Sequence, residues 1–93
     1  MINGNLTDFL DKLYTGEELL FEYEGVDFFL QGWYDSGLSI MVLDRLTPPT
    51  IDGYIWHCSC STMRECAESF LDEPIWKNRK FLEVQNSIIW KEF

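Results

Sequence analysis

The sequence has few of the residues on which enzyme sites most often rely. It contains one histidine and three cysteines, and it lacks both a glycine-rich phosphate loop and a Gly-x-Ser-x-Gly nucleophile turn. A nucleophilic thiol needs a nearby base, and His57 is the one histidine able to serve Cys58. Adjacent residues of a strand face opposite ways, so His57 is poorly placed to do so. We therefore expect a protein that is not an enzyme.

Long apolar runs are also missing. The longest, such as Ile40 to Leu43, are far too short to cross a bilayer. The first residues have neither the basic nor the apolar region of a secretory signal. An odd number of cysteines fits a reducing compartment better than a disulfide framework. These features favour a cytoplasmic protein without a membrane partner.

The cysteines and the histidine include the right ligand types for zinc, but their spacing argues against a zinc site. Cys58 and Cys60 share one face of a predicted strand while His57 points to the other, and no Cys-x-x-Cys pair is present. Cys66 lies on the apolar stripe of a predicted helix, where a free cysteine behaves as a small hydrophobic residue. We expect packed, reduced thiols, with no metal and no cofactor.

What the chain does have is much apolar material in a short length. Its 93 residues are 46% hydrophobic and 16% aromatic. Large rings bury the most area per residue, so this composition predicts a folded chain. A chain of this length has room for one core, and we expect a single domain over residues 1–93.

The apolar pattern predicts helices segregated from a mainly antiparallel sheet. Helical spacing runs from Leu6 to Tyr14, with Gly16 as a stop, and again from Met63 to Leu71 behind a Thr62/Glu65 capping box. The remaining predicted elements are a hairpin over 18–33, strands over 38–44 and 54–60, loops over 47–53 and 74–80, and a short helix followed by a strand within 81–93. This order defines an α+β domain.

The predicted hairpin turns at Glu24-Gly25, and this turn sets its register. One face is then wholly apolar, with the cross-strand pairs Tyr23/Val26, Phe21/Phe28 and Leu19/Leu30. The other face pairs Glu22 with Asp27, Leu20 with Phe29 and Glu18 with Gln31, and Trp33 lies further along. Like charges directly opposite are unfavourable, and large rings are rarely left in water. This second face must be covered by the rest of the chain or by another molecule.

The third strand has two alternative registers. A two-residue loop and a three-residue loop in the turn Asp35-Ser36-Gly37 would place opposite faces of the strand inward.

Nearly all of the net charge of −9 lies in the first half of the chain. Residues 1–44 hold nine acidic residues against Lys12, a charge of −8. Direct binding to a phosphate backbone needs the opposite sign, whereas a basic protein surface is favoured. An apolar centre with an acidic rim is typical of protein-binding sites, and charge that only aids solubility is the alternative. The predicted partner-binding residues are Glu18, Leu20, Glu22, Glu24, Asp27, Phe29 and Trp33.

The short length, the acidic first half and the Glu18 to Trp33 hairpin together resemble the small acidic accessory proteins of phages and other mobile elements. Among these are the anti-CRISPR inhibitors, many of which occupy the basic nucleic-acid groove of a nuclease. The resemblance is one of type and transfers no functional residue. It implies a stoichiometric inhibitor or adaptor that occludes a basic, nucleic-acid-binding surface of a partner protein. The alternative is a structural or regulatory module whose exposed sheet face forms a homodimer.

Overall fold

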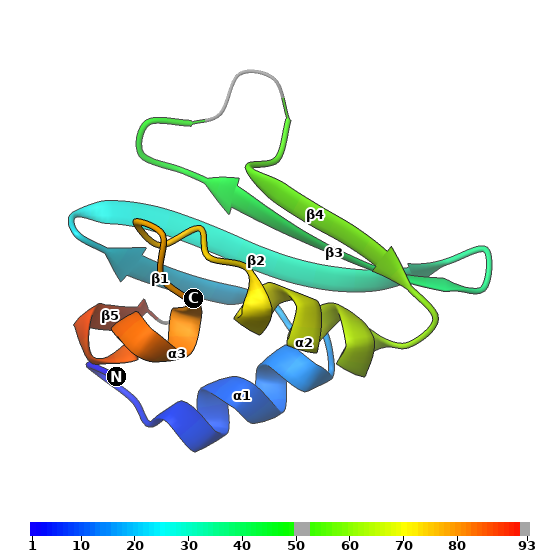
Figure 1. Ribbon diagram of the computed structural model, residues 1–93, viewed down its shortest axis with the longest axis horizontal. Coiled ribbons are helices and arrows are strands. Elements are labelled where there is room, and N and C mark those ends of the chain that lie inside the picture. The colour runs from blue at the N-terminus through cyan, green and yellow to red at the C-terminus, as the bar shows by residue number, and fades with distance from the viewer. Residues whose placement is uncertain (50–52, 92–93) are drawn as a thin grey trace.

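A computed structural model describes residues 1–49 and 53–91 and confirms an α+β fold with an antiparallel sheet (Figure 1). The helices are α1 (Leu6–Tyr14), α2 (Met63–Asp72) and α3 (Phe81–Val84), and a 3-10 turn covers Gln85–Ser87. The strands are β1 (Leu19–Tyr23), β2 (Val26–Asp35), β3 (Leu38–Arg45), β4 (Trp56–Cys60) and β5 (Ile88–Lys91), in the spatial order β4-β3-β2-β1-β5. Part of the predicted 47–53 loop and the last two residues of the predicted final strand lie outside the described residues.

Both hairpins of the β1-β2-β3 meander have two-residue turns with positive φ at both central positions. These are Glu24 and Gly25 in the first hairpin, and Ser36 and Gly37 in the second. Such turns match the twist of the flanking strands. The predicted register of the first hairpin is confirmed, from Leu19 opposite Leu30 to Tyr23 opposite Val26. The two-residue turn also settles the register of β3, which places Ile40 opposite Trp33.

The core lies between the helices and one face of the sheet. The side chains of Phe9, Phe21, Phe70 and Phe81 are completely buried there. The 74–80 segment is a loop, as predicted, but Trp76 at its centre is only 2% exposed. Its ring lies 5.1 to 6.2 Å, measured between ring centroids, from the rings of Tyr23, Phe28, Phe21, Phe81 and Phe70. This loop therefore contributes a central part of the core.

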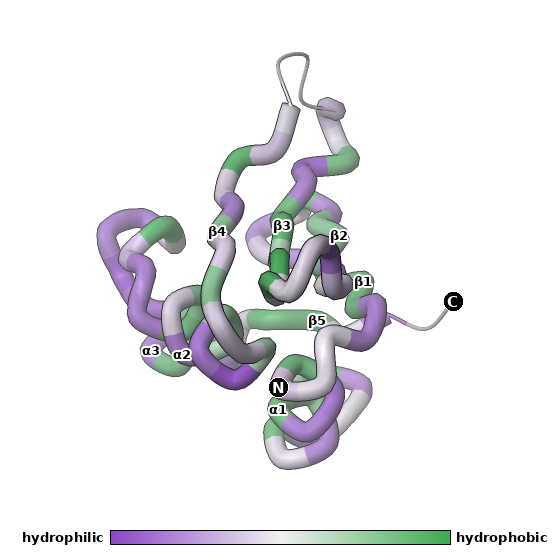
Figure 2. The backbone as a smooth tube through the Cα atoms, turned by 90° about the vertical axis from the view of Figure 1, so that its right-hand side faces the viewer, coloured by the Kyte–Doolittle hydropathy of each residue, from purple (hydrophilic) through white to green (hydrophobic). Residues whose placement is uncertain are grey.

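Side-chain caps stabilise the first turns of α1 and α2. The backbone N–H of Asp8 donates to the Asn5 side chain (2.8 Å) at the start of α1, and that of Glu65 donates to Thr62 Oγ1 (3.2 Å) at the start of α2. The α1 tube alternates between hydrophobic and hydrophilic segments in Figure 2, as expected of a helix with one buried side. No helix in the described ranges is long and apolar enough to cross a membrane.

Candidate functional site

The three helices all lie on one side of the sheet, so the other side is not covered by any helix of the described chain (Figure 1). We call this surface the open face. Cross-strand partners run across it in rows: Glu22/Asp27, then Leu20/Phe29/Asp44, then Gln31/Val42/His57, then Trp33/Ile40. Trp33 is 37% exposed, whereas Val42 is only 2% exposed. The open face thus combines an apolar strip with carboxylates at its margins.

The like-charged pair predicted on the hairpin is neutralised from within the chain. Lys91 of β5 places its Nζ atom 2.6 Å from Asp27 Oδ1 and 3.1 Å from Glu22 Oε1. The hydrogen bonds to Asp27 and Glu22 raise the pKa of Lys91. Glu24, at the turn, forms an ion pair with Lys77, and this contact raises the pKa of that lysine. Three of the four predicted acidic residues therefore have a cation of the same chain beside them.

Glu18 and Asp44, at the margin of the open face, have no such cation. Within the part of the chain that the structure describes, neither Glu18 nor Asp44 has an ion-pair or side-chain hydrogen-bond partner. Glu18 is exposed just before β1, and Asp44 is half-buried opposite Phe29. Burial raises the pKa of Asp44. Sequence reasoning identified Glu18 but missed Asp44, because its face depended on the unresolved register of β3.

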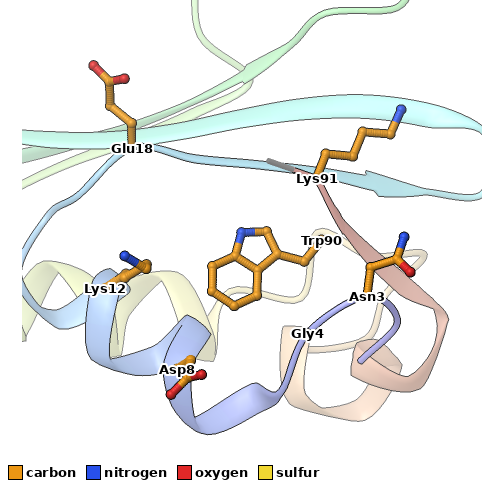
Figure 3. A pocket seen from close by; sticks show the side chains of 7 residues that line it. All are labelled: Asn3, Gly4, Asp8, Lys12, Glu18, Trp90 and Lys91. Carbon is orange, nitrogen blue, oxygen red and sulfur yellow. The ribbon is translucent and has the colours of Figure 1, made fainter. Parts of the chain in front are cut away.

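A pocket of about 490 Å³ adjoins the open face where α1 meets β1 and β5 (Figure 3). The indole of Trp90 lies across it, and Lys12 and Asp8 of α1 stand on one side. Gly4 is needed here because a Cβ atom at this position would collide with the Trp90 ring. Glu18 and Lys91 line the pocket as well, so the pocket and the acidic hairpin form one continuous surface.

The three cysteines come together on the opposite, helix-covered side of the sheet. Their Sγ atoms all lie within 4.8 Å of one another, although Cys66 belongs to α2 and the other two belong to β4. Burial raises the pKa of Cys58 and of Cys66, so neither has the lowered pKa of a nucleophilic thiolate. His57, on the open face, lies on the other side of β4, as its position in the strand predicts.

Comparisons with protein-family models, with curated proteins and with solved structures found no match to this chain. The structure itself defines a small α+β domain with one open sheet face. It places Leu20, Glu22, Asp27, Phe29 and Trp33 together on that face, Glu18 at its edge and Glu24 at the hairpin turn. Their role in binding a partner stays a prediction.

Proposed function

We propose that this chain is a non-catalytic protein-binding module of the cytoplasm that docks its open face against a basic surface of another protein. It acts as a stoichiometric inhibitor or adaptor, and the surface that it occludes is one that binds nucleic acid. An anti-CRISPR inhibitor of a nuclease is the most specific form of this proposal.

The observation that carries the proposal is the pair of unpartnered carboxylates on the same sheet face as an exposed tryptophan. Glu18 and Asp44 lack cationic partners in the described chain, and Trp33 and Ile40 lie on the same open face. The net charge is −9, so the field around the molecule favours a basic partner. An apolar centre with a charged rim is how many protein interfaces are built.

The proposed mechanism is occlusion. Lys and Arg side chains of the partner, which otherwise contact phosphates, form charge-assisted hydrogen bonds with Glu18 and Asp44. The Trp33 ring supplies apolar area at the centre of the contact, where aromatic anchors contribute most to affinity. Lys91 already neutralises Glu22 and Asp27, so these two residues contribute less than their charge suggests. Glu18 and Asp44 are therefore expected to contribute more to binding than Glu22 and Asp27 do.

The test begins with the tagged chain as bait in the cells that encode it. A captured basic protein is purified, and its association and dissociation rates are measured across a salt series. The Glu18→Gln/Asp44→Asn variant should associate more slowly and show a weaker salt dependence, because charges at the rim of an interface act mainly on encounter. Trp33→Ala should dissociate faster with little change in the salt dependence. Added nucleic acid should compete with the wild-type chain for the partner.

The matched control is Asp11→Asn/Glu68→Gln, which removes the same charge from α1 and α2 on the helix side. It should bind as the wild type does. If the control loses binding to the same extent, the loss depends on the overall charge of the chain. That result would contradict docking by the open face. A wild-type chain that elutes as a dimer, and that Trp33→Ala converts to a monomer, would instead establish the homodimer alternative.

A further inference from the structure

The cluster of three thiols beneath the sheet is a feature that the proposed docking does not use. Cys58 and Cys60 point from β4 towards the helices, and Cys66 comes from the first turn of α2. The Cys66 thiol donates to the backbone carbonyl of Ser39 (3.3 Å), and the Cys58 thiol lies 3.9 Å from the carbonyl of Cys66. A strand and the helix that follows it along the chain therefore direct their sulfur atoms at one point.

The spacing of the sulfur atoms is close to what a shared metal ion requires. Three sulfurs bound at about 2.3 Å to one ion in a plane lie about 4.0 Å apart. The observed separations are all within 4.8 Å, so rotations of the side chains suffice to close the remaining gap. No imidazole or carboxylate of the described residues joins the group within that distance. The protein ligand set is thus three soft sulfur donors.

A buried hydroxyl beside the cluster has no hydrogen-bond partner. Ser39 is 1% exposed, and its Oγ atom makes no hydrogen bond to the described chain. It is the cross-strand neighbour of Cys60 and lies on the same face of the sheet. A thiolate sulfur would accept the hydrogen bond that this hydroxyl lacks. Such outer contacts are typical of metal-bound ligands.

The cluster also has a route to solvent for a cation. An open depression on the surface is lined by Cys60 together with Glu65, Glu68, Ser69 and Asp72 of α2. Glu68 forms an ion pair with Arg64, and Asp72 forms one with Lys80, so Glu65 is the carboxylate of this lining that has no cation beside it in the described chain. A carboxylate at an entrance raises the local concentration of cations.

We propose that Cys58, Cys60 and Cys66 form a binding site for one thiophilic cation with a filled d shell, namely Cu(I) or Zn(II). On binding, each thiol transfers its proton to solvent and each sulfur forms one bond to the ion, so three protons leave and no electron is transferred. Cu(I) is satisfied by three sulfurs. Zn(II) requires a fourth ligand, and a water molecule entering from the depression beside Cys60 would supply it. The site departs from the metal-free thiols that the sequence predicts, and it stands independently of docking by the open face.

The experiment uses the full chain, reduced and freed of metal, under anaerobic conditions. Cu(I) alone and Zn(II) alone are titrated in separate arms, each against a chromogenic chelator. We expect one equivalent to bind in at least one arm, with three sulfur ligands at about 2.3 Å by X-ray absorption. The two arms distinguish the ions, since only the zinc complex adds an oxygen ligand.

Variants separate the site from adventitious binding. Cys60→Ser should weaken metal binding by more than about 100-fold, and Ser39→Ala should weaken it by about 10-fold through loss of the outer hydrogen bond. His57→Ala is the matched control, because this residue neighbours Cys58 but faces the other side of the sheet, and it should leave affinity unchanged. Circular dichroism of each variant verifies that it is folded.

Three results would overturn the proposal. These are a folded, reduced wild type that binds neither ion stoichiometrically, binding that persists in folded Cys60→Ser, and binding that is lost in His57→Ala. If Cys60→Ser does not fold, the site is tested instead by measuring whether bound metal protects the wild-type thiols from a thiol reagent. All three thiols must become unreactive when one equivalent of ion is bound. Continued reactivity of any of them would contradict the proposed site.

Discussion

Replacing Ser39 with alanine should stabilise the metal-free protein, although serine to alanine changes at buried positions commonly remove a hydrogen bond. The Ser39 side chain is buried, and its hydroxyl has no partner in the described chain. Leaving a buried polar group unsatisfied costs about 1–3 kcal/mol. Alanine removes this cost and leaves a gap of a single atom, so we expect a net gain of about 1 kcal/mol. In a domain of this size that gain corresponds to a rise in Tm of about 4–8 °C.

The assay is thermal and urea unfolding of the reduced, metal-free chain, with Ser59→Ala as control. Ser59 is exposed on the opposite face of the neighbouring strand, and its replacement should change stability by no more than about 0.5 kcal/mol. A loss of stability in Ser39→Ala would mean that the hydroxyl is satisfied in solution, and it would refute the reasoning. Under saturating Cu(I) or Zn(II) the gain should shrink or reverse, because the bound form uses the hydroxyl.

Three further changes test the core and the charged margin. Trp76→Ala should cost about 3–5 kcal/mol in urea unfolding, since its buried ring contacts five others, and a loss below about 1 kcal/mol would contradict a core position for the loop. The ion pairs of Lys91 should stabilise the wild type below pH 10.5, and this stabilisation should be lost as the pH rises through the raised pKa of Lys91. Lys91→Met lacks it at every pH, so the unfolding curves of the two proteins should converge at high pH. Burial raises the pKa of Asp44 in the folded state, so the native protein holds this proton to higher pH than the unfolded chain does. The wild type should therefore lose some stability as the pH rises above 3.8, and Asp44→Asn should abolish this loss. Equal pH slopes in this variant and wild type would contradict that.

Local sequence signals were sufficient to predict most of the fold. The turn at Glu24-Gly25 indicated the first hairpin, helical spacing indicated α1, and the Thr62/Glu65 capping box marked the start of α2. The register of β3 could not be predicted, because the choice between two turn lengths after Asp35 has no local signature in this sequence. The burial of Trp76 was missed for a related reason. Charged neighbours and Pro74 indicate a loop, and only the tertiary structure reveals that the loop folds back over the core.

The candidate sites were predictable only where they depend on a single element. Leu20, Phe29 and Trp33 share a face because of strand alternation, which the sequence shows directly. Lys91 reaches Glu22 and Asp27 because β5 pairs with β1, a contact between segments distant in the sequence that periodicity cannot reveal. The thiol cluster had a partial signal, since the sequence placed the β4 cysteines on one face and Cys66 on the inner stripe of its helix. Their convergence depends on how α2 crosses the sheet.

The same alternation separates the two proposed sites physically. Along β4, His57 and Ser59 face outward while Cys58 and Cys60 face the helices, so successive residues serve opposite sides of one strand. A metal ion among the thiols would join β4 to α2 without contacting Trp33, Glu18 or Asp44 on the surface proposed for docking. Residues without shared partners act nearly independently. Failure of the thiol site would therefore leave the docking proposal intact, and a partner bound at the open face would leave the depression beside Cys60 accessible to a cation.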